Sequence, residues 1–212
     1  MTLLFKPREF VEIQGQAMAT ERLQALSQAV LASAYLQQNV LNARFATTLG
    51  FSVIFRQAAE LLEQFPEMGE FLGLMQSTRP QTSLYYLNVL VIGAAGQVER
   101  HVDHSIRGYD PKLPLPWRVT VLYLQVPEME GGELLLYDKY DQLSRRIQPQ
   151  PGMLVHFSGQ SKHAVAAISQ AATPRVSLVC EQYSLSRKQL EAVPEFSIKS
   201  MAPFAAFLGE QL

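Results

Sequence analysis

Cysteine, charge and long hydrophobic runs are all scarce in this sequence. Cysteine occurs once in 212 residues, as Cys180, which excludes an internal disulfide and a zinc site built from cysteines. Charged residues make up 17% of the chain and the formal net charge is -1, so nothing favours nucleic acid or an anionic membrane as a partner. No apolar run approaches the roughly 20 residues of a membrane-spanning helix, and residues 1–10 lack the apolar core of a signal peptide. We expect a soluble cytoplasmic protein and leave its oligomeric state open.

The length predicts one domain over residues 1–212, in which 48% of the residues are hydrophobic. Apolar residues recur at helical spacing in several stretches of residues 1–82, which are expected to form a helical support. The expected helical segments are the stretch that follows Thr20 as its N-cap, the stretch Ile54–Phe65, the short stretch Phe71–Met75 and a C-terminal helical tail over residues 185–212.

The composition changes between residues 83 and 184. Short runs rich in Val, Leu, Ile and Tyr alternate there with glycine and proline, which is typical of many short strands. About eight strands of this kind predict a double-stranded β-helix, the jelly-roll or cupin-like barrel. We therefore expect a mainly β fold with N-terminal helices that cover one face of the barrel. The expected strands are Leu84–Ile92, Val98–Asp103, Trp117–Val126, Glu133–Asp138, Ile147–Gln148, Met153–Phe157, His163–Ile168 and Arg175–Ser184.

The histidines are unevenly distributed, because all four lie between residues 101 and 163. In the stretch His101-Val102-Asp103, an extended backbone would point the imidazole and the carboxylate to the same side. A nitrogen donor and an anionic oxygen suit a divalent first-row metal, and one more histidine completes the facial triad of non-haem Fe(II) oxygenases. His163, at the start of an expected strand, is the candidate third ligand.

Arg175 follows His163 at a distance that suggests a second binding function. We expect residues 163–168 and 175–179 to form an antiparallel hairpin, which places Arg175 roughly 13 to 17 Å from His163. A five-carbon dicarboxylate and an extended guanidinium would span that gap, and arginine is suited to two-point recognition of a carboxylate. Ser177, on the same face of the strand, would add a hydroxyl donor.

Several motifs now stand in a specific order between residues 83 and 184. On these motifs the sequence resembles the prolyl-4-hydroxylase-like branch of the Fe(II)/2-oxoglutarate-dependent dioxygenases, over roughly half of the chain. The matching stretches are Leu87-Asn88-Val89-Leu90-Val91-Ile92-Gly93, His101-Val102-Asp103, Arg118-Val119-Thr120-Val121-Leu122-Tyr123-Leu124, Glu130-Gly131-Gly132-Glu133-Leu134, Pro151-Gly152-Met153-Leu154-Val155-His156-Phe157, His163 and Arg175-Val176-Ser177-Leu178.

The resemblance implies a catalytic double-stranded β-helix over residues 83–184 with the metal at one open end. It implies Fe(II) held by His101, Asp103 and His163, and a 2-oxoglutarate carboxylate held by Arg175. Dioxygen would be the further cosubstrate and ascorbate an additional reductant. The implied reaction is hydroxylation of an unactivated C–H bond, with succinate and CO2 as coproducts. A prolyl peptide, a free amino acid and a small metabolite all stay open as substrates.

The chain departs from the family at two positions. Ile92 and Leu122 stand where many members carry aromatic contacts to 2-oxoglutarate. The cosubstrate pocket is therefore expected to use Arg175 and Ser177, together with Asn88 and Tyr123.

The segment from His104 to Pro116 is long for a connection, and it follows two candidate ligands directly. Arg107, Tyr109 and Trp117 in and beside it are candidate substrate contacts, although an ordinary exposed loop explains the segment equally well. His104 is interpreted as a loop residue, because strand alternation turns it away from Asp103. His156 is interpreted as a hydrogen-bonded histidine of the core or surface.

Two other classes of protein stay open. The first is a cupin-like metalloprotein that uses the His/Asp/His site without 2-oxoglutarate, which a solvent-facing Arg175 would favour. The second is a non-catalytic binding module on the same fold, which the missing aromatic contacts at Ile92 and Leu122 would favour. A nucleic-acid demethylase of this fold is disfavoured, because Glu181 occupies the position of the second arginine that such enzymes carry.

Overall fold

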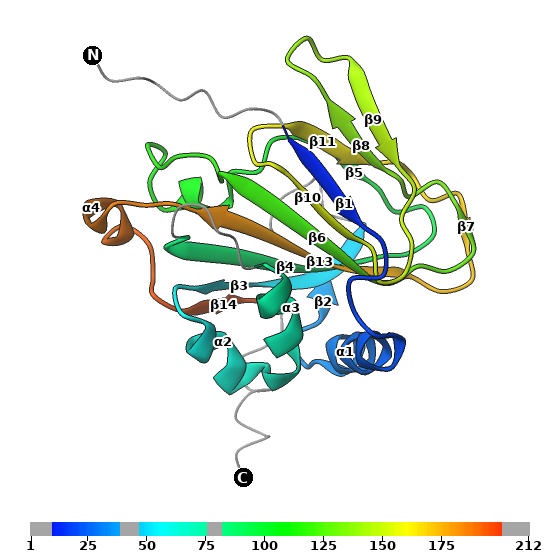
Figure 1. The fold of residues 1–212 in the computed structure, drawn as a ribbon, viewed down its shortest axis with the longest axis horizontal. Helices are drawn as coiled ribbons and strands as arrows, with labels where there is room; N and C mark the ends of the chain where they lie inside the picture. The colour runs from blue at the N-terminus through cyan, green and yellow to red at the C-terminus, as the bar shows by residue number, and fades with distance from the viewer. Residues whose placement is uncertain (1–9, 39–46, 76–81, 201–212) are drawn as a thin grey trace.

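Two antiparallel β-sheets face each other in the computed structural model, which describes residues 10–38, 47–75 and 82–200 (Figure 1). The large sheet has the strand order β1-β10-β6-β13-β4-β3-β14, with β2 beside β3. The small sheet has the order β5-β11-β8-β9, and β7 pairs with β12. The strands are β1 (Val11–Gln14), β2 (Gln37–Gln38), β3 (Thr48–Phe55), β4 (Leu84–Ile92), β5 (Val98–His101), β6 (Arg118–Gln125), β7 (Met129–Glu130), β8 (Leu134–Tyr137), β9 (Leu143–Ile147), β10 (Leu154–Ser158), β11 (Lys162–Val165), β12 (Gln170–Ala171), β13 (Arg175–Tyr183) and β14 (Ser197–Lys199).

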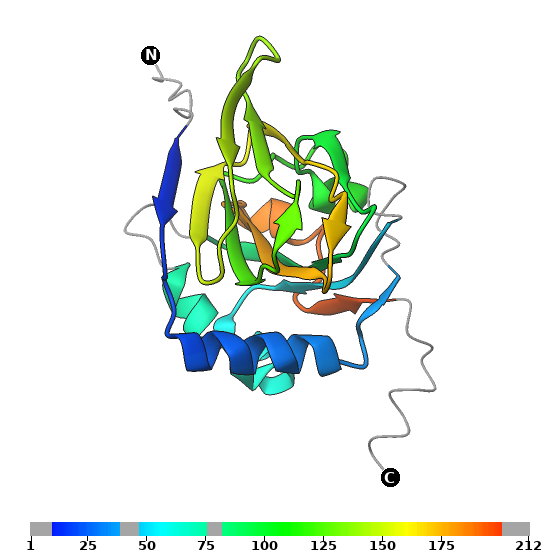
Figure 2. The ribbon, with the colours of Figure 1, turned by 90° about the vertical axis from the view of Figure 1, so that its right-hand side faces the viewer.

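Helices cover the outer face of the large sheet, which confirms the expected fold class (Figure 2). Alternate residues of a strand point to opposite faces, so Val176, Leu178 and Cys180 of β13 pack in one cluster with helix residues such as Leu26 and Leu61. The odd-numbered residues of β13 consequently face the small sheet. None of the helices in the described ranges is long and apolar enough to cross a membrane. The helices are α1 (Thr20–Ala32), α2 (Ala58–Gln64), α3 (Gly69–Leu74) and α4 (Arg187–Leu190), with 3-10 turns η2 (Pro66–Met68) and η3 (Ser105–Gly108).

The N-terminal third is less helical than predicted. It contributes β1, β2 and β3 to the large sheet, and Ile54, expected at the start of a helix, is a residue of β3. Every residue of β3 except Leu49 is buried. A strand buried on both faces shows no alternation of apolar and polar residues, so its pattern is easily mistaken for a helix. Thr20 is the first residue of α1 rather than its N-cap, which is Ala19.

The C-terminal tail is also only partly helical. Residues 185–200 contain one short helix, α4, and one short strand, β14. This strand pairs with β3 at the edge of the large sheet. β14 has only three residues, which is too short for a clear alternating pattern. Residues 201–212 lie outside the described part of the chain, so the helix expected there stays a prediction.

The expected strands of residues 83–184 are present, with small shifts of their ends. Of the short strand expected at Ile147–Gln148, Ile147 is the last residue of the longer strand β9. The first four residues of β9 are exposed, and Ile147 is its one buried residue. The hairpin expected between residues 163–168 and 175–179 is wrong. β11 pairs with β5 and β8 in the small sheet, whereas β13 pairs with β4 and β6 in the large sheet. The connecting segment crosses between the sheets, so the two strands face one another across the barrel.

The Gly131-Gly132 pair makes a close contact that explains the motif. Gly131 has φ +85°, and a Cβ at this position would lie 1.8 Å from the carbonyl oxygen of Ala167. Both the backbone conformation and the contact with another backbone exclude a side chain. We expect Gly131→Ala to lower the free energy of unfolding by about 2–4 kcal/mol in denaturant titrations. Gly93→Ala, where a Cβ meets nothing within 4 Å, is the matched control, and equal losses in the two variants would contradict this explanation.

Candidate metal centre and cosubstrate pocket

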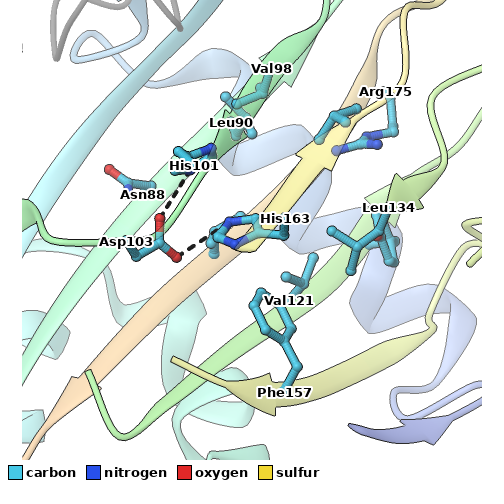
Figure 3. A pocket seen from close by; sticks show the side chains of 13 residues that line it. Asn88, Leu90, Val98, His101, Asp103, Val121, Leu134, Phe157, His163 and Arg175 are labelled. Carbon is cyan, nitrogen blue, oxygen red and sulfur yellow. Dashed lines mark hydrogen bonds and ion pairs between the residues drawn. The ribbon is translucent and has the colours of Figure 1, made fainter. Parts of the chain in front are cut away.

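Two histidines and one aspartate converge in the pocket between the two sheets (Figure 3). His101, at the end of β5, and His163, in β11, are direct partners in the antiparallel ladder, and their ring centroids are 4.3 Å apart. Asp103 follows just after β5 and lies between the two rings. Its Oδ1 is 3.1 Å from Nε2 of His101, and its Oδ2 is 3.5 Å from Nε2 of His163. The side chains therefore meet as the two-residue spacing predicted.

Backbone carbonyls fix the orientation of both imidazoles. Nδ1 of His101 lies 2.7 Å from the carbonyl oxygen of Glu99, and Nδ1 of His163 lies 3.2 Å from that of Ser161. Because a carbonyl oxygen only accepts, each Nδ1 must carry the proton. In a neutral ring, Nε2 then presents a lone pair toward Asp103. Hydrogen bonds of this kind are the usual way in which proteins orient histidine ligands of a metal.

The donor set fits a divalent first-row metal. One ligand atom from each of the three residues lies within 4.8 Å of the others, and within the described ranges this is the one such group of His, Cys, Asp or Glu side chains. Asp103 and His163 are 8% and 6% exposed. A buried carboxylate is costly unless a cation or several donors compensate it. Two imidazoles and one carboxylate are the protein ligands of the Fe(II) facial triad.

A pocket extends from the triad between the two sheets. Its polar wall contains the triad, Asn88, Tyr123 and Arg175. The remaining side chains make most of the pocket apolar. These side chains, which the sequence reasoning did not assign to the site, are Leu90, Val98, Val121, Leu134, Phe157, Val165 and Val179.

Arg175 lies on the opposite sheet from His163 and is 1% exposed. Its Nη1 donates to the carbonyl oxygen of Gly132, and the guanidinium carbon is 5.2 Å from the ring centroid of Tyr123. Nε is buried without a hydrogen-bond partner. Among the residues that the structure describes, no carboxylate lies within ion-pair distance of Arg175. Burial lowers the pKa of Arg175. A buried guanidinium with an unused donor fits an anionic group in the pocket.

Asn88 adds a polar group to the pocket wall, whereas Ser177, on the same face of β13 as Arg175, is not one of the residues that line the pocket. Ser177 lies two residues after Arg175, is fully buried, and its Oγ has no hydrogen-bond partner. Asn88 lines the pocket, and its Oδ1 accepts from the hydroxyl of Ser52 at 2.6 Å. That contact fixes the amide so that its nitrogen is left to donate. Figure 3 shows Asn88 on the His101 side of the pocket.

An aromatic side chain does face the pocket from β6. Leu122 packs in the cluster under the helices, whereas its neighbour Tyr123 lines the pocket and is 1% exposed. Burial raises the pKa of Tyr123, so its phenol stays protonated. Phe157 contributes a second ring, whose centroid is 5.0 Å from that of His163. Tyr123 lies in β6, a partner strand of β13, and Phe157 lies in β10, which pairs with the other edge of β6.

The three candidate substrate contacts do not line this pocket. Nε of Arg107 donates to the carbonyl oxygen of Leu113 at 2.8 Å, which braces the loop. The ring of Tyr109 lies 4.4 Å from Nζ of Lys199. Nε1 of Trp117 donates to the hydroxyl of Thr82 at 3.3 Å, and the Trp117 ring stacks on the guanidinium of Arg118. Their role as substrate contacts stays a prediction.

The two remaining histidines lie outside the triad. His104 is exposed. Nδ1 of His156 lies 2.8 Å from Oγ1 of Thr120, and burial lowers the pKa of His156 to about 4. His156 is therefore neutral and hydrogen-bonded, as the sequence interpretation had it.

One buried acid near the metal centre was missed. Glu181 is fully buried, and burial together with the negative charge of Asp103 raises its pKa to about 8. Its carboxyl group accepts hydrogen bonds from Ser105 and Tyr183. The sequence reasoning considered Glu181 only as a position that lacks an arginine, because its neighbours come from distant parts of the chain.

Comparisons with known proteins agree with this site. A sequence profile of the 2OG-Fe(II) oxygenase superfamily matches residues 77–180. A search of curated proteins gives no match. Among solved structures, a Pseudomonas putida prolyl-4-hydroxylase is similar with a TM-score of 0.57 and 17% identity, covering 83% of this chain and 94% of that chain. A Trichoplax adhaerens prolyl hydroxylase, solved with a peptide fragment of a hypoxia inducible factor oxygen degradation domain, has a TM-score of 0.55 and 14% identity, covering 86% and 84%. A collagen prolyl hydroxylase of Paramecium Bursaria Chlorella virus-1, solved with 2OG, has a TM-score of 0.52 and 14% identity, covering 83% and 97%.

The fold and the site define a jelly-roll protein with a facial triad of the non-haem iron type. The chain belongs to the 2OG-Fe(II) oxygenase superfamily. The cofactors of that family are Fe(II), 2-oxoglutarate and O2. The prolyl hydroxylase structures, at 14–17% identity, share the fold.

Proposed function

We propose that this protein is a 2-oxoglutarate-dependent hydroxylase in which His101, Asp103 and His163 hold Fe(II). The observation that carries the proposal is the triad at one end of a pocket whose opposite sheet supplies a buried arginine. When bound, the iron would use 2-oxoglutarate and O2 to oxidise an unactivated C–H bond, with succinate and CO2 as coproducts. Residues 83–184 would be the catalytic core of a single-domain chain.

In this proposal the chain's own residues bind and orient the cosubstrate. Arg175 would hold the distal carboxylate of 2-oxoglutarate through its unused donor, assisted by the hydroxyl of Ser177. Tyr123 would support the guanidinium by its ring face, and Asn88 would donate from its amide on the triad side. The apolar wall excludes water, which strengthens these contacts and limits side reactions.

We propose a prolyl or amino-acid-like substrate, free or within a peptide. The support is the shared fold with prolyl hydroxylases, one of which was solved with a peptide fragment. The substrate would approach past the loop that carries Arg107 and Tyr109, beside Trp117. Ascorbate as a reductant, the cytoplasmic location and the absence of nucleic-acid and membrane partners remain predictions from the sequence.

The alternatives from the sequence lose support at two residues. A cupin-like metalloprotein without 2-oxoglutarate would be favoured by a solvent-facing Arg175, but Arg175 is buried and lines the pocket. The hypothesis of a non-catalytic binding module was based on the missing aromatic contacts at Ile92 and Leu122. An aromatic side chain, Tyr123, nevertheless faces the pocket.

Anaerobic binding followed by turnover tests the proposal. Fe(II) and then 2-oxoglutarate are added to the purified protein without oxygen, and the visible absorption of the complex is recorded. Air is then admitted with a panel of prolyl peptides, amino acids and small metabolites, and succinate is measured. We expect a new absorption band that needs both additions, and succinate release that rises with a suitable substrate. Iron binding without any response to 2-oxoglutarate would instead support the cupin-like alternative.

A further inference from the structure

Glu181 lies where an apolar side chain would ordinarily be expected. It lies near the C-terminal end of β13, between Tyr86 of β4 and Val119 of β6, and it is fully buried. Among the described residues, no lysine, arginine or histidine forms an ion pair with it. Burying a carboxyl group without a cation is costly unless hydrogen-bond donors satisfy it.

Three donors from two elements satisfy this carboxyl group. The hydroxyl of Ser105 donates to Oε1, and the backbone N–H of Ser105 donates to Oε2 at 3.3 Å. The hydroxyl of Tyr183, two residues further along β13, also donates to Oε2. The carboxyl group thus connects the large sheet to the first residue of η3.

The connection matters because of what precedes η3. β5 ends at His101, and residues 102–104 belong to no helix or strand. Asp103 is therefore positioned by the two ends of a short irregular segment. One end is His101 in the β5–β11 ladder, and the other is Ser105 against Glu181.

We propose that Glu181 is a positioning residue for the metal centre, which fixes Asp103 by holding Ser105 with its carboxyl group. This inference rests on the proposed metal site. Some groups orient a metal ligand without binding the metal themselves. Removing such a group typically lowers metal affinity about 10- to 100-fold. Tyr183 supports the same carboxyl group from its own strand.

Cobalt(II) titration of the metal-free, full-length protein tests the proposal without relying on turnover. Glu181→Met keeps the approximate length of the side chain but removes both oxygens that Ser105 and Tyr183 contact. We expect Co²⁺ to bind this variant about 10- to 100-fold more weakly than the wild type, as followed by visible absorption. Ser105→Ala, which changes the other end of the contact, should weaken binding in the same direction, and Ser105→Thr, which retains a hydroxyl, should restore it.

Gln182→Met is the matched control. Gln182 is the next residue of β13, is equally buried, and hydrogen-bonds Thr120 and Arg118 on the opposite face of the sheet. Its replacement should lower the melting temperature and leave Co²⁺ affinity within about twofold of the wild type, since its partners do not touch residues 101–105. The melting temperature of each metal-free variant is measured alongside.

The outcomes separate this inference from the hydroxylase proposal. Wild-type Co²⁺ affinity in Glu181→Met, or in Ser105→Ala if the former does not fold, overturns the positioning role and leaves the hydroxylase proposal intact. Equal losses of affinity in Glu181→Met and Gln182→Met also overturn it, because they indicate a general loss of packing in β13. The expected pattern in a protein that never releases succinate supports the positioning role and contradicts the hydroxylase proposal. Failure of the wild type to bind Co²⁺ overturns both.

Discussion

Asp103→Ala is expected to abolish Fe(II) binding and to reduce succinate release by more than about a hundredfold. Asp103 is the one anionic ligand of the triad, and it bridges both imidazoles, with contacts of 3.1 and 3.5 Å. Without Asp103, the site retains two imidazoles but no negative charge that could compensate the charge of a divalent cation. His163→Ala should have an effect of similar size, because it removes a lone pair that a backbone carbonyl holds in the correct orientation.

A variant of an exposed acid controls for nonspecific effects of charge removal. Glu128→Ala changes an exposed carboxylate outside the pocket, and its iron binding and turnover should equal those of the wild type. Metal binding is measured anaerobically, and succinate is measured in the same preparations. Normal turnover by Asp103→Ala or His163→Ala would refute the metal assignment, and with it the proposed reaction.

The convergence of the triad was predictable because its first part is local. His101 and Asp103 are two residues apart on extended backbone, so their directions follow from strand geometry alone. His163, the third ligand, was identified through the order of motifs that the chain shares with a known family. The ladder that joins His101 to His163 is a long-range pairing, which the sequence does not encode in any local pattern.

The error in the hairpin shows the limit of the same reasoning. Two apolar runs separated by a short turn normally pair with one another. Here β11 and β13 belong to different sheets, and both are central strands with partners on either side. Alternation predicts which face a residue occupies but not which strand lies next to it. Arg175 therefore reaches the site across the barrel rather than along a ladder.

Glu181 and β3 were missed for a related reason. A strand such as β3, with seven of its eight residues buried, lacks the contrast between faces on which pattern reading depends. Glu181 reads as an ordinary charged residue until its three donors, from Ser105 and Tyr183, are brought to it by folding. Buried polar residues are the features that the sequence pattern least reveals, because their partners are distant in the chain.

Arg175→Leu is expected to raise the KM for 2-oxoglutarate by about a hundredfold while Co²⁺ binding stays normal. Breaking a buried charge pair costs about 2–5 kcal/mol, and 1.4 kcal/mol corresponds to a factor of ten. The guanidinium now lies buried without an anionic partner among the described residues. Replacing it with an apolar side chain should therefore leave the melting temperature of the cosubstrate-free protein unchanged or raise it.

Arg175→Lys distinguishes recognition by shape from recognition by charge. Lysine retains the positive charge but lacks the planar arrangement of donors, so its KM should lie between those of the wild type and Arg175→Leu. Arg187→Leu, at an exposed arginine of α4, is the control for charge removal and should not change the KM. If Arg175→Leu folds and shows the wild-type KM, then Arg175 does not bind the cosubstrate. Its burial beside Tyr123 would then be purely structural, and a metal site that works without 2-oxoglutarate would become the better explanation of the pocket.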